Sequence, residues 1–71
     1  MRYAVVIEQA GENYSAYVPD LPGCVATGAT IEETTSRIRE AITFHLEALR
    51  EEGDPAPQPQ AVVAMVEVAA D

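Results

Sequence analysis

The stretch PDLPGC, residues 19–24, divides the sequence into two parts. Proline cannot donate a backbone hydrogen bond to a strand ladder, and the dipeptide Pro-Gly is a strong turn signal. The stretch therefore predicts an ordered loop rather than a strand. It also predicts that regular elements end and begin on its two sides.

Two strand-like runs precede this loop. Residues 2–8 are rich in aromatic and β-branched types, and residues 14–18 alternate in polarity. Gly11 and Asn13 lie between the two runs, so a hairpin turn is predicted there. Residues 24–27, directly after the loop, predict a short third strand.

A long amphipathic helix is predicted to begin at about Thr30. Thr30 and Glu33 have the spacing of a capping box, in which each side chain binds a free amide of the first turn. Gly53 predicts the C-terminal cap, with Pro55 just beyond. At helical spacing the apolar residues form one broad face, and most glutamates lie on the solvent side.

A proline-containing connector, residues 54–60, follows the helix, and the apolar run at residues 62–68 predicts a fourth strand. The sequence therefore predicts an α+β fold of order β-β-β-α-β, as a single domain over residues 1–71. One helix should pack on one face of a small, mostly antiparallel sheet. Nothing in the predicted elements covers the other face.

The composition indicates a protein partner rather than nucleic acid. Four arginines stand against twelve acidic residues, a formal charge of -8, which repels phosphate backbones and favours a basic protein surface. A single cysteine cannot form an internal disulfide, and no run of residues is long and apolar enough to span a membrane. We expect a cytoplasmic protein without membrane contact.

The PDLPGC string, the Thr30–Glu33 pair, the helical run REAITFHLEAL at residues 39–49 and the proline-containing connector together resemble HicB-type antitoxins. The resemblance covers nearly the whole chain. It implies a domain related to a reduced ribonuclease H fold, which binds and blocks a small basic RNA-cleaving toxin of the HicA type. Many members also carry a C-terminal DNA-binding domain. This chain shows no second basic segment, so we expect a solitary HicB-type N-terminal domain.

A partner-binding surface is predicted from exposed aromatic and acidic residues. Phe44 lies off the centre of the apolar helix face, and Tyr17 points away from its apolar neighbours, beside the PDLPGC loop. Charge on the helix and in the loop would speed the approach of a basic toxin. The glutamates are most simply a solvated face, and Asp20 is typical of a turn that caps backbone amides. The partner-binding candidates are Tyr17, Asp20, Leu21, Glu40, Phe44 and Glu47.

Two other functions are compatible with parts of the sequence. The domain could be a homodimer or homotetramer without a toxin partner, pairing through a strand edge or the uncovered sheet face. An enzyme is not expected, because Asp20 has only Glu8 and Glu67 as strand-borne carboxylates for a two-metal site. Cys24 and His45 lack a third group that would orient them. We therefore expect no catalytic residues, metal or cofactor.

Overall fold

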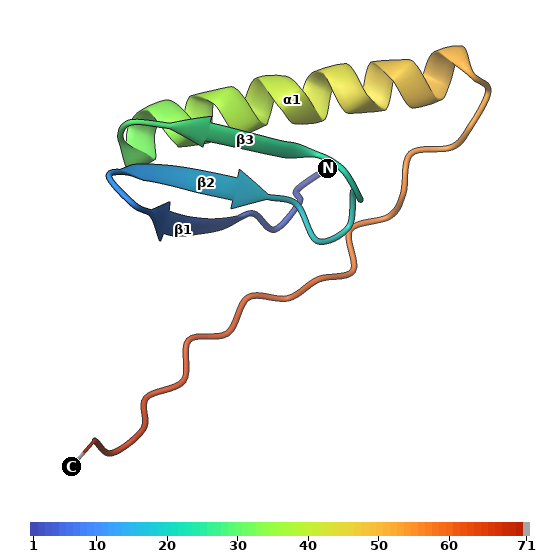
Figure 1. Cartoon of the computed structure of the whole chain (residues 1–71). Coiled ribbons are helices and arrows are strands. Elements are labelled where there is room, and N and C mark those ends of the chain that lie inside the picture. Colours follow the sequence, from blue (N-terminus) through green and yellow to red (C-terminus); the bar gives the residue numbers. More distant parts are fainter. Residues whose placement is uncertain (71) are drawn as a thin grey trace.

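The computed structural model describes residues 1–70. Three strands, β1 (Val6–Ala10), β2 (Asn13–Tyr17) and β3 (Val25–Gly28), form an antiparallel sheet of order β1-β2-β3. The helix α1 (Ile31–Glu51) lies across one face of this sheet, and the chain then leaves the body as an extended tail (Figure 1). The predicted α+β class, with one helix on a small antiparallel sheet, is confirmed.

The turns form where the sequence predicts them. Gly11, with φ +63°, occupies the first position of the two-residue loop that joins Ala10 to Asn13, as a type II′ hairpin requires. In the PDLPGC loop, the Leu21 amide donates to the Val18 carbonyl at 3.0 Å, and the Cys24 amide donates to the Leu21 carbonyl at 3.1 Å. The loop is therefore a pair of hydrogen-bonded turns.

Both ends of α1 are capped. The Glu33 amide donates to Thr30 Oγ1 at 3.0 Å, and Glu33 Oε1 accepts from the Ala29 amide at 2.7 Å. The capping box is thus present, although Glu33 reaches one residue further back than its usual partner. At the other end Gly53 has φ +80° and its amide donates to the Arg50 carbonyl, which together with an Asp54-to-Leu49 bond forms a Schellman motif.

The core lies between the sheet and the first half of α1. Its fully buried members come from β2, the PDLPGC loop and the helix: Ala16, Val18, Leu21, Cys24 and Ile38. The end of β3 approaches the helix so closely that a Cβ on Gly28 would lie 2.8 Å from the Thr34 amide nitrogen. Only glycine fits there, so this position fixes the distance between β3 and the start of α1.

The strand boundaries differ from the prediction. The first strand begins at Val6 instead of residue 2, and its hairpin loop is shorter than expected. Residues 3–5 are nevertheless half-buried, and the Tyr3 hydroxyl donates to the Pro57 carbonyl at 2.6 Å. The side chains of residues 3–5 pack against the core as those of a strand do. Their backbone, however, pairs with no other strand at this edge.

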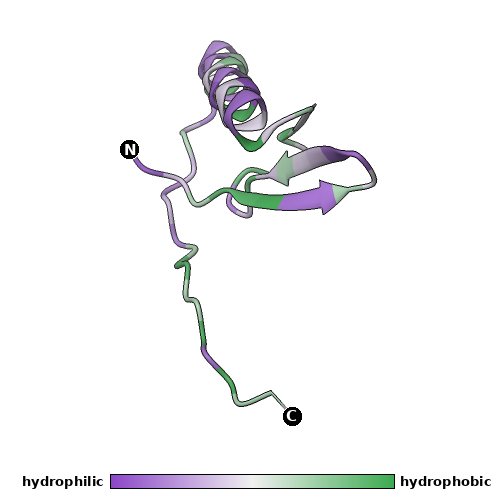
Figure 2. Cartoon of the chain, turned by 90° about the vertical axis from the view of Figure 1, so that its left-hand side faces the viewer, coloured by the Kyte–Doolittle hydropathy of each residue, from purple (hydrophilic) through white to green (hydrophobic). Residues whose placement is uncertain are grey.

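The prediction of a fourth strand at residues 62–68 is wrong for this structure. Residues 61–70 are extended and every one of them is exposed (Figures 1 and 2). The apolar run was correctly identified as strand-like, but a strand exists only where a neighbouring edge accepts its hydrogen bonds. In the described part of the chain this segment meets no such edge. We call residues 61–70 the tail.

Candidate protein-binding surface

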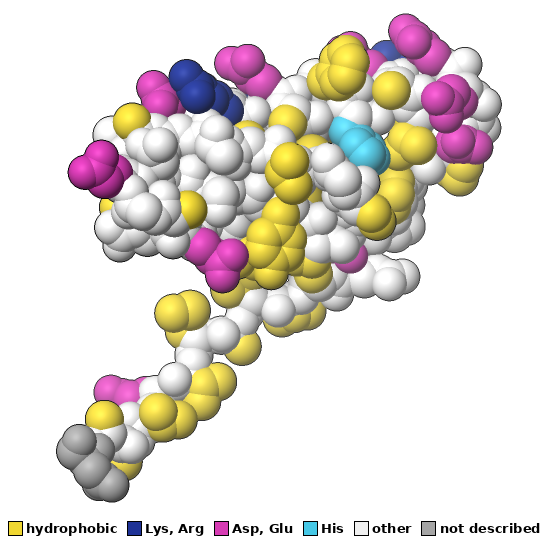
Figure 3. All heavy atoms as spheres, in the orientation of Figure 1, with side chains coloured by type: hydrophobic (Ala, Val, Ile, Leu, Met, Phe, Trp, Pro, Cys, Tyr) yellow, Lys and Arg dark blue, Asp and Glu magenta, His cyan; other side chains and the backbone are white. Residues whose placement is uncertain are grey.

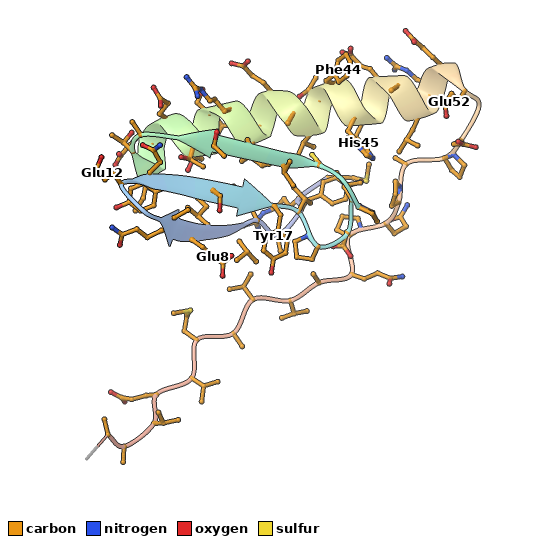
Figure 4. All side chains as sticks on the ribbon, viewed as in Figure 1. Glu8, Glu12, Tyr17, Phe44, His45 and Glu52 are labelled. Carbon is orange, nitrogen blue, oxygen red and sulfur yellow. The ribbon has the colours of Figure 1, made fainter. Side chains whose placement is uncertain are left out.

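The outer side of α1 carries one aromatic residue among carboxylates. Glu40, Phe44, Glu47 and Glu51 follow one another at intervals of four, three and four residues, which places them in one row along the helix. We call this row the helix stripe. All four side chains are exposed, and Phe44 is 74% exposed. Figure 4 shows Phe44 on the side of α1 away from the sheet, and Figure 3 shows acidic side chains along the helix.

The N-terminal part of α1 is tied to the sheet beside this row. Arg37 Nη1 donates to the Thr27 carbonyl of β3 at 3.1 Å, and Arg37 Nη2 lies 3.8 Å from a carboxylate oxygen of Glu33. The Arg37 guanidinium is therefore already paired within the chain. The helix stripe continues past Arg37 toward the C-terminal end of α1. An exposed phenyl ring flanked by carboxylates can insert into an apolar pocket rimmed by cations.

Tyr17 lies on the opposite side of the molecule. Cross-strand pairing places Val6, Tyr17 and Val25 in one row on the sheet face that α1 does not cover. Tyr17 is 44% exposed and Val25 is 64% exposed. The residues predicted to bind a partner therefore do not form one surface, because Tyr17 is separated from the helix stripe by the thickness of the domain (Figure 4).

The two loop candidates have structural roles. Leu21 is 0% exposed, so the expectation that its side chain contacts a partner is wrong; it fills the core beneath the loop. Asp20 Oδ2 accepts from the amides of Gln60 and Ala61 at 3.1 and 3.0 Å. Asp20 caps backbone amides, as the sequence predicts. These amides belong to the base of the tail rather than to the turn that contains Asp20.

Sequence reasoning missed a groove beside the N-terminal segment. It has a volume of about 540 Å³ and runs between residues 1–5 and the side of α1 that carries Ile38, Ile42 and Leu46. A second hollow of about 470 Å³ shares Met1, Thr43 and Leu46 with it and continues toward the helix end. The apolar residues Ile42 and Leu46, which are half-buried, were the available signal. That they line a groove depends on the width of the sheet beneath the helix, which the sequence does not show.

The side chains considered for chemistry are a set of carboxylates and the pair Cys24 and His45. Within residues 1–70, no three side chains among His, Cys, Asp and Glu lie close enough to hold a metal ion. Cys24 is buried, and burial raises the pKa of its thiol, which keeps it protonated at neutral pH and weakens it as a nucleophile.

Comparison with known proteins identifies the family. The family model for the HicB-like antitoxin of bacterial toxin–antitoxin systems matches residues 3–70. This chain belongs to the HicB-like antitoxin family. The predicted resemblance is thus confirmed, and the family is described by its antitoxin role rather than by an enzymatic activity.

Two solved structures resemble the HicB-like chain. One is a HicA3 and HicB3 toxin-antitoxin complex, with a TM-score of 0.71 and 35% identity, covering 83% of this chain and 70% of the other. The second is the N-terminal domain of the Burkholderia pseudomallei antitoxin HicB, with a TM-score of 0.72 and 32% identity, covering 82% and 69%. The fold of this chain is therefore that of a HicB N-terminal domain.

A curated relative is longer than this HicB-like chain. An uncharacterized 14.9 kDa protein in the rep-hol intergenic region of Haemophilus phage HP1 is 38% identical over 58 residues. The match covers 82% of this chain but only 44% of the phage protein, so the chain spans less than half of that relative.

In the part of the chain that the structure describes, no helix is long and apolar enough to cross a membrane.

Proposed function

We propose that this HicB-like domain is an antitoxin module that binds a small basic RNA-cleaving toxin of the HicA type and blocks its access to RNA. The observation that carries the proposal is the helix stripe: an exposed phenyl ring with carboxylates on both sides, in a chain of net charge -8. The similarity to the antitoxin chain of a HicA3 and HicB3 complex supports it. Such a role places the domain in the cytoplasm, with the RNA that the toxin would cleave.

The two kinds of side chain in the stripe act at different stages. A surface that binds RNA needs Lys and Arg, so its field attracts Glu40, Glu47 and Glu51 and accelerates the encounter. These carboxylates remain at the solvated rim, where each ion pair adds little affinity. Phe44 then supplies affinity, because an aromatic ring that leaves water on binding is typical of the residues that dominate interface energies.

Inhibition follows from occupation and requires no chemistry by this chain. With the helix stripe against the basic surface, the toxin presents no cations to the RNA backbone. The described side chains need only keep their positions, and the capped, core-packed helix provides that rigidity. A pre-formed surface loses little conformational entropy on binding, which favours tight association.

The test is inhibition of RNA cleavage by a purified HicA-type toxin as the domain is added. We expect stoichiometric inhibition by the native domain, and a loss of affinity of about 2 kcal/mol, or roughly 30-fold, for Phe44→Ala. Tyr17→Ala is the matched control, since it removes an exposed aromatic ring from the other side of the domain. Unchanged inhibition by Phe44→Ala, or cleavage that continues at excess native domain, would reject the proposal.

A further inference from the structure

The tail has the pattern of a strand but no partner. Along residues 62–68 one side presents only apolar residues, Val62, Ala64, Val66 and Val68, and the other side carries Met65 and Glu67. Met65 is 92% exposed and Val66 is 78% exposed. An extended apolar segment with free backbone groups is a ready partner for a strand edge.

The base of the tail is fixed and its direction leads away from its own sheet. Asp20 holds the amides of Gln60 and Ala61, and the Tyr3 hydroxyl holds the Pro57 carbonyl. Beyond these anchors the chain diverges from the body in both views (Figures 1 and 2). The tail is thus presented outward, where another molecule can reach it.

The body has a vacant place for one more strand. The helix packs against β3 and β2, and it has far fewer contacts with β1, which forms one edge of the sheet. Beside residues 1–5, which lead into that edge, lies the groove of about 540 Å³, whose apolar lining includes Val5, Ile38, Ile42 and Leu46. A strand added next to residues 2–7 would place alternate side chains in this groove and complete the cover beneath α1.

The charges around the groove match the tail. Arg2 and Arg39 line the groove, whose lining contains no carboxylate, whereas its continuation is lined by Arg50 together with Glu47 and Asp54. The single charge between residues 61 and 70 is Glu67. A second copy has a net charge of -8 and would be repelled by the helix stripe, whereas its tail brings only one carboxylate, Glu67, to the edge that carries Arg2.

We propose that the tail of one copy adds as an antiparallel strand to the edge formed by residues 2–7 of a second copy, and that the exchange is reciprocal. The occupant of the groove is thus a second copy of this chain. A reciprocal exchange gives a closed dimer with one type of contact used twice. The proposal does not depend on the proposed toxin, because no residue of the helix stripe lines the groove, although Glu47 borders the hollow that continues it.

The alternation of side chains defines the register. Tyr3, Val5 and Ile7 face the helix and are packed against the core. Antiparallel pairing of Val66 with Tyr3 and of Val62 with Ile7 directs the fully apolar side of the tail into the groove. The same register pairs Glu67 with Arg2 on the opposite face. A shift by one residue would turn Met65 and Glu67 toward the helix, so the pattern selects this register.

The oligomeric state of the full chain, measured by sedimentation equilibrium, provides the first test. We expect a dimer, and we expect Val66→Pro to raise its dissociation constant on the order of a hundredfold, because proline removes a ladder donor and a buried side chain. Phe44→Ala, on the helix stripe, should leave the constant unchanged. A native chain that stays monomeric at millimolar concentration, or a dimer that Val66→Pro leaves intact, would overturn the proposal.

A mixture of isotope-labelled and unlabelled chains tests exchange between copies. Intermolecular nuclear Overhauser effects between Val62–Val68 and residues 2–7 are expected, whereas contacts found only within one copy would show that the tail folds back on its own sheet and overturn the proposal. Charge reversal tests the register: Arg2→Glu should weaken the dimer about threefold to tenfold, and adding Glu67→Arg should restore it. Failure of the double variant to restore affinity would reject this register.

Discussion

The body and the tail use the same types of residue with opposite results. In the body, apolar side chains such as Val18 and Ile38 are buried, and the helix ends and turns have their backbone groups capped. In the tail, Val62, Met65 and Val66 are among the most exposed residues of the chain. Local sequence is therefore enough to make a segment extended, but a strand also needs a neighbouring edge with room beside it.

The free energy of unfolding should change most in a comparison of two aliphatic truncations, one in the core and one in the tail. Ile38→Ala should lower the free energy of unfolding by about 2–5 kcal/mol at any protein concentration, because it opens a cavity in the core. Val66→Ala should cost less than about 0.5 kcal/mol in the monomer, since its side chain is exposed there, and more as the protein concentration rises and the dimer forms. Urea unfolding at two concentrations measures both. An equal, concentration-independent loss in the two variants would mean that the tail belongs to the body.

A smaller effect is expected where β3 meets the helix. Gly28→Ala should lower the free energy of unfolding by about 1–3 kcal/mol, because the new methyl group meets backbone atoms of Thr34 that cannot move away alone. Thr27→Ala, on the neighbouring exposed residue, serves as the control, with a cost near zero. If Gly28→Ala unfolds at the same urea concentration as the native chain, the close approach of β3 to α1 does not constrain the fold.

The smallest effect concerns the anchor between body and tail. Asp20→Ala should lower the free energy of unfolding by about 1 kcal/mol, because it removes the acceptor of two backbone amides. Its clearer result should be faster hydrogen exchange at Gln60 and Ala61, measured by nuclear magnetic resonance. Asp20→Asn retains an acceptor oxygen and should slow that exchange again. Exchange that is identical in all three proteins would show that Asp20 does not hold the tail.

Much of the fold follows from local sequence. The Thr30–Glu33 cap, the Gly53 end of the helix and the Pro22-Gly23 turn each depend on residues within a few positions of one another, so the sequence predicts them. The tail could not be placed in the same way, because strand pairing depends on an edge supplied elsewhere in space. The start of β1 differs from the prediction for the same reason, because residues 2–5 have no neighbouring strand with which to pair.

The candidate surface shows the same division. The exposure of Phe44 follows from helical periodicity, and the structure agrees. The burial of Leu21 and the role of Asp20 could not be predicted, because the packing that covers Leu21 and the amides that Asp20 binds come from distant parts of the chain. The groove is also a tertiary feature, since it arises from a helix that overhangs a three-stranded sheet.

The domain is proposed to bind its toxin through the helix stripe and a second copy through its tail. The most direct measurement is a nuclear magnetic resonance titration of the labelled domain with a HicA-type toxin. We expect the signals of the Phe44 ring and of Glu40, Glu47 and Glu51 to shift, while those of Val62–Val68 and Val6–Ala10 stay in place. Shifts confined to the tail and β1, with the Phe44 ring unaffected, would contradict it.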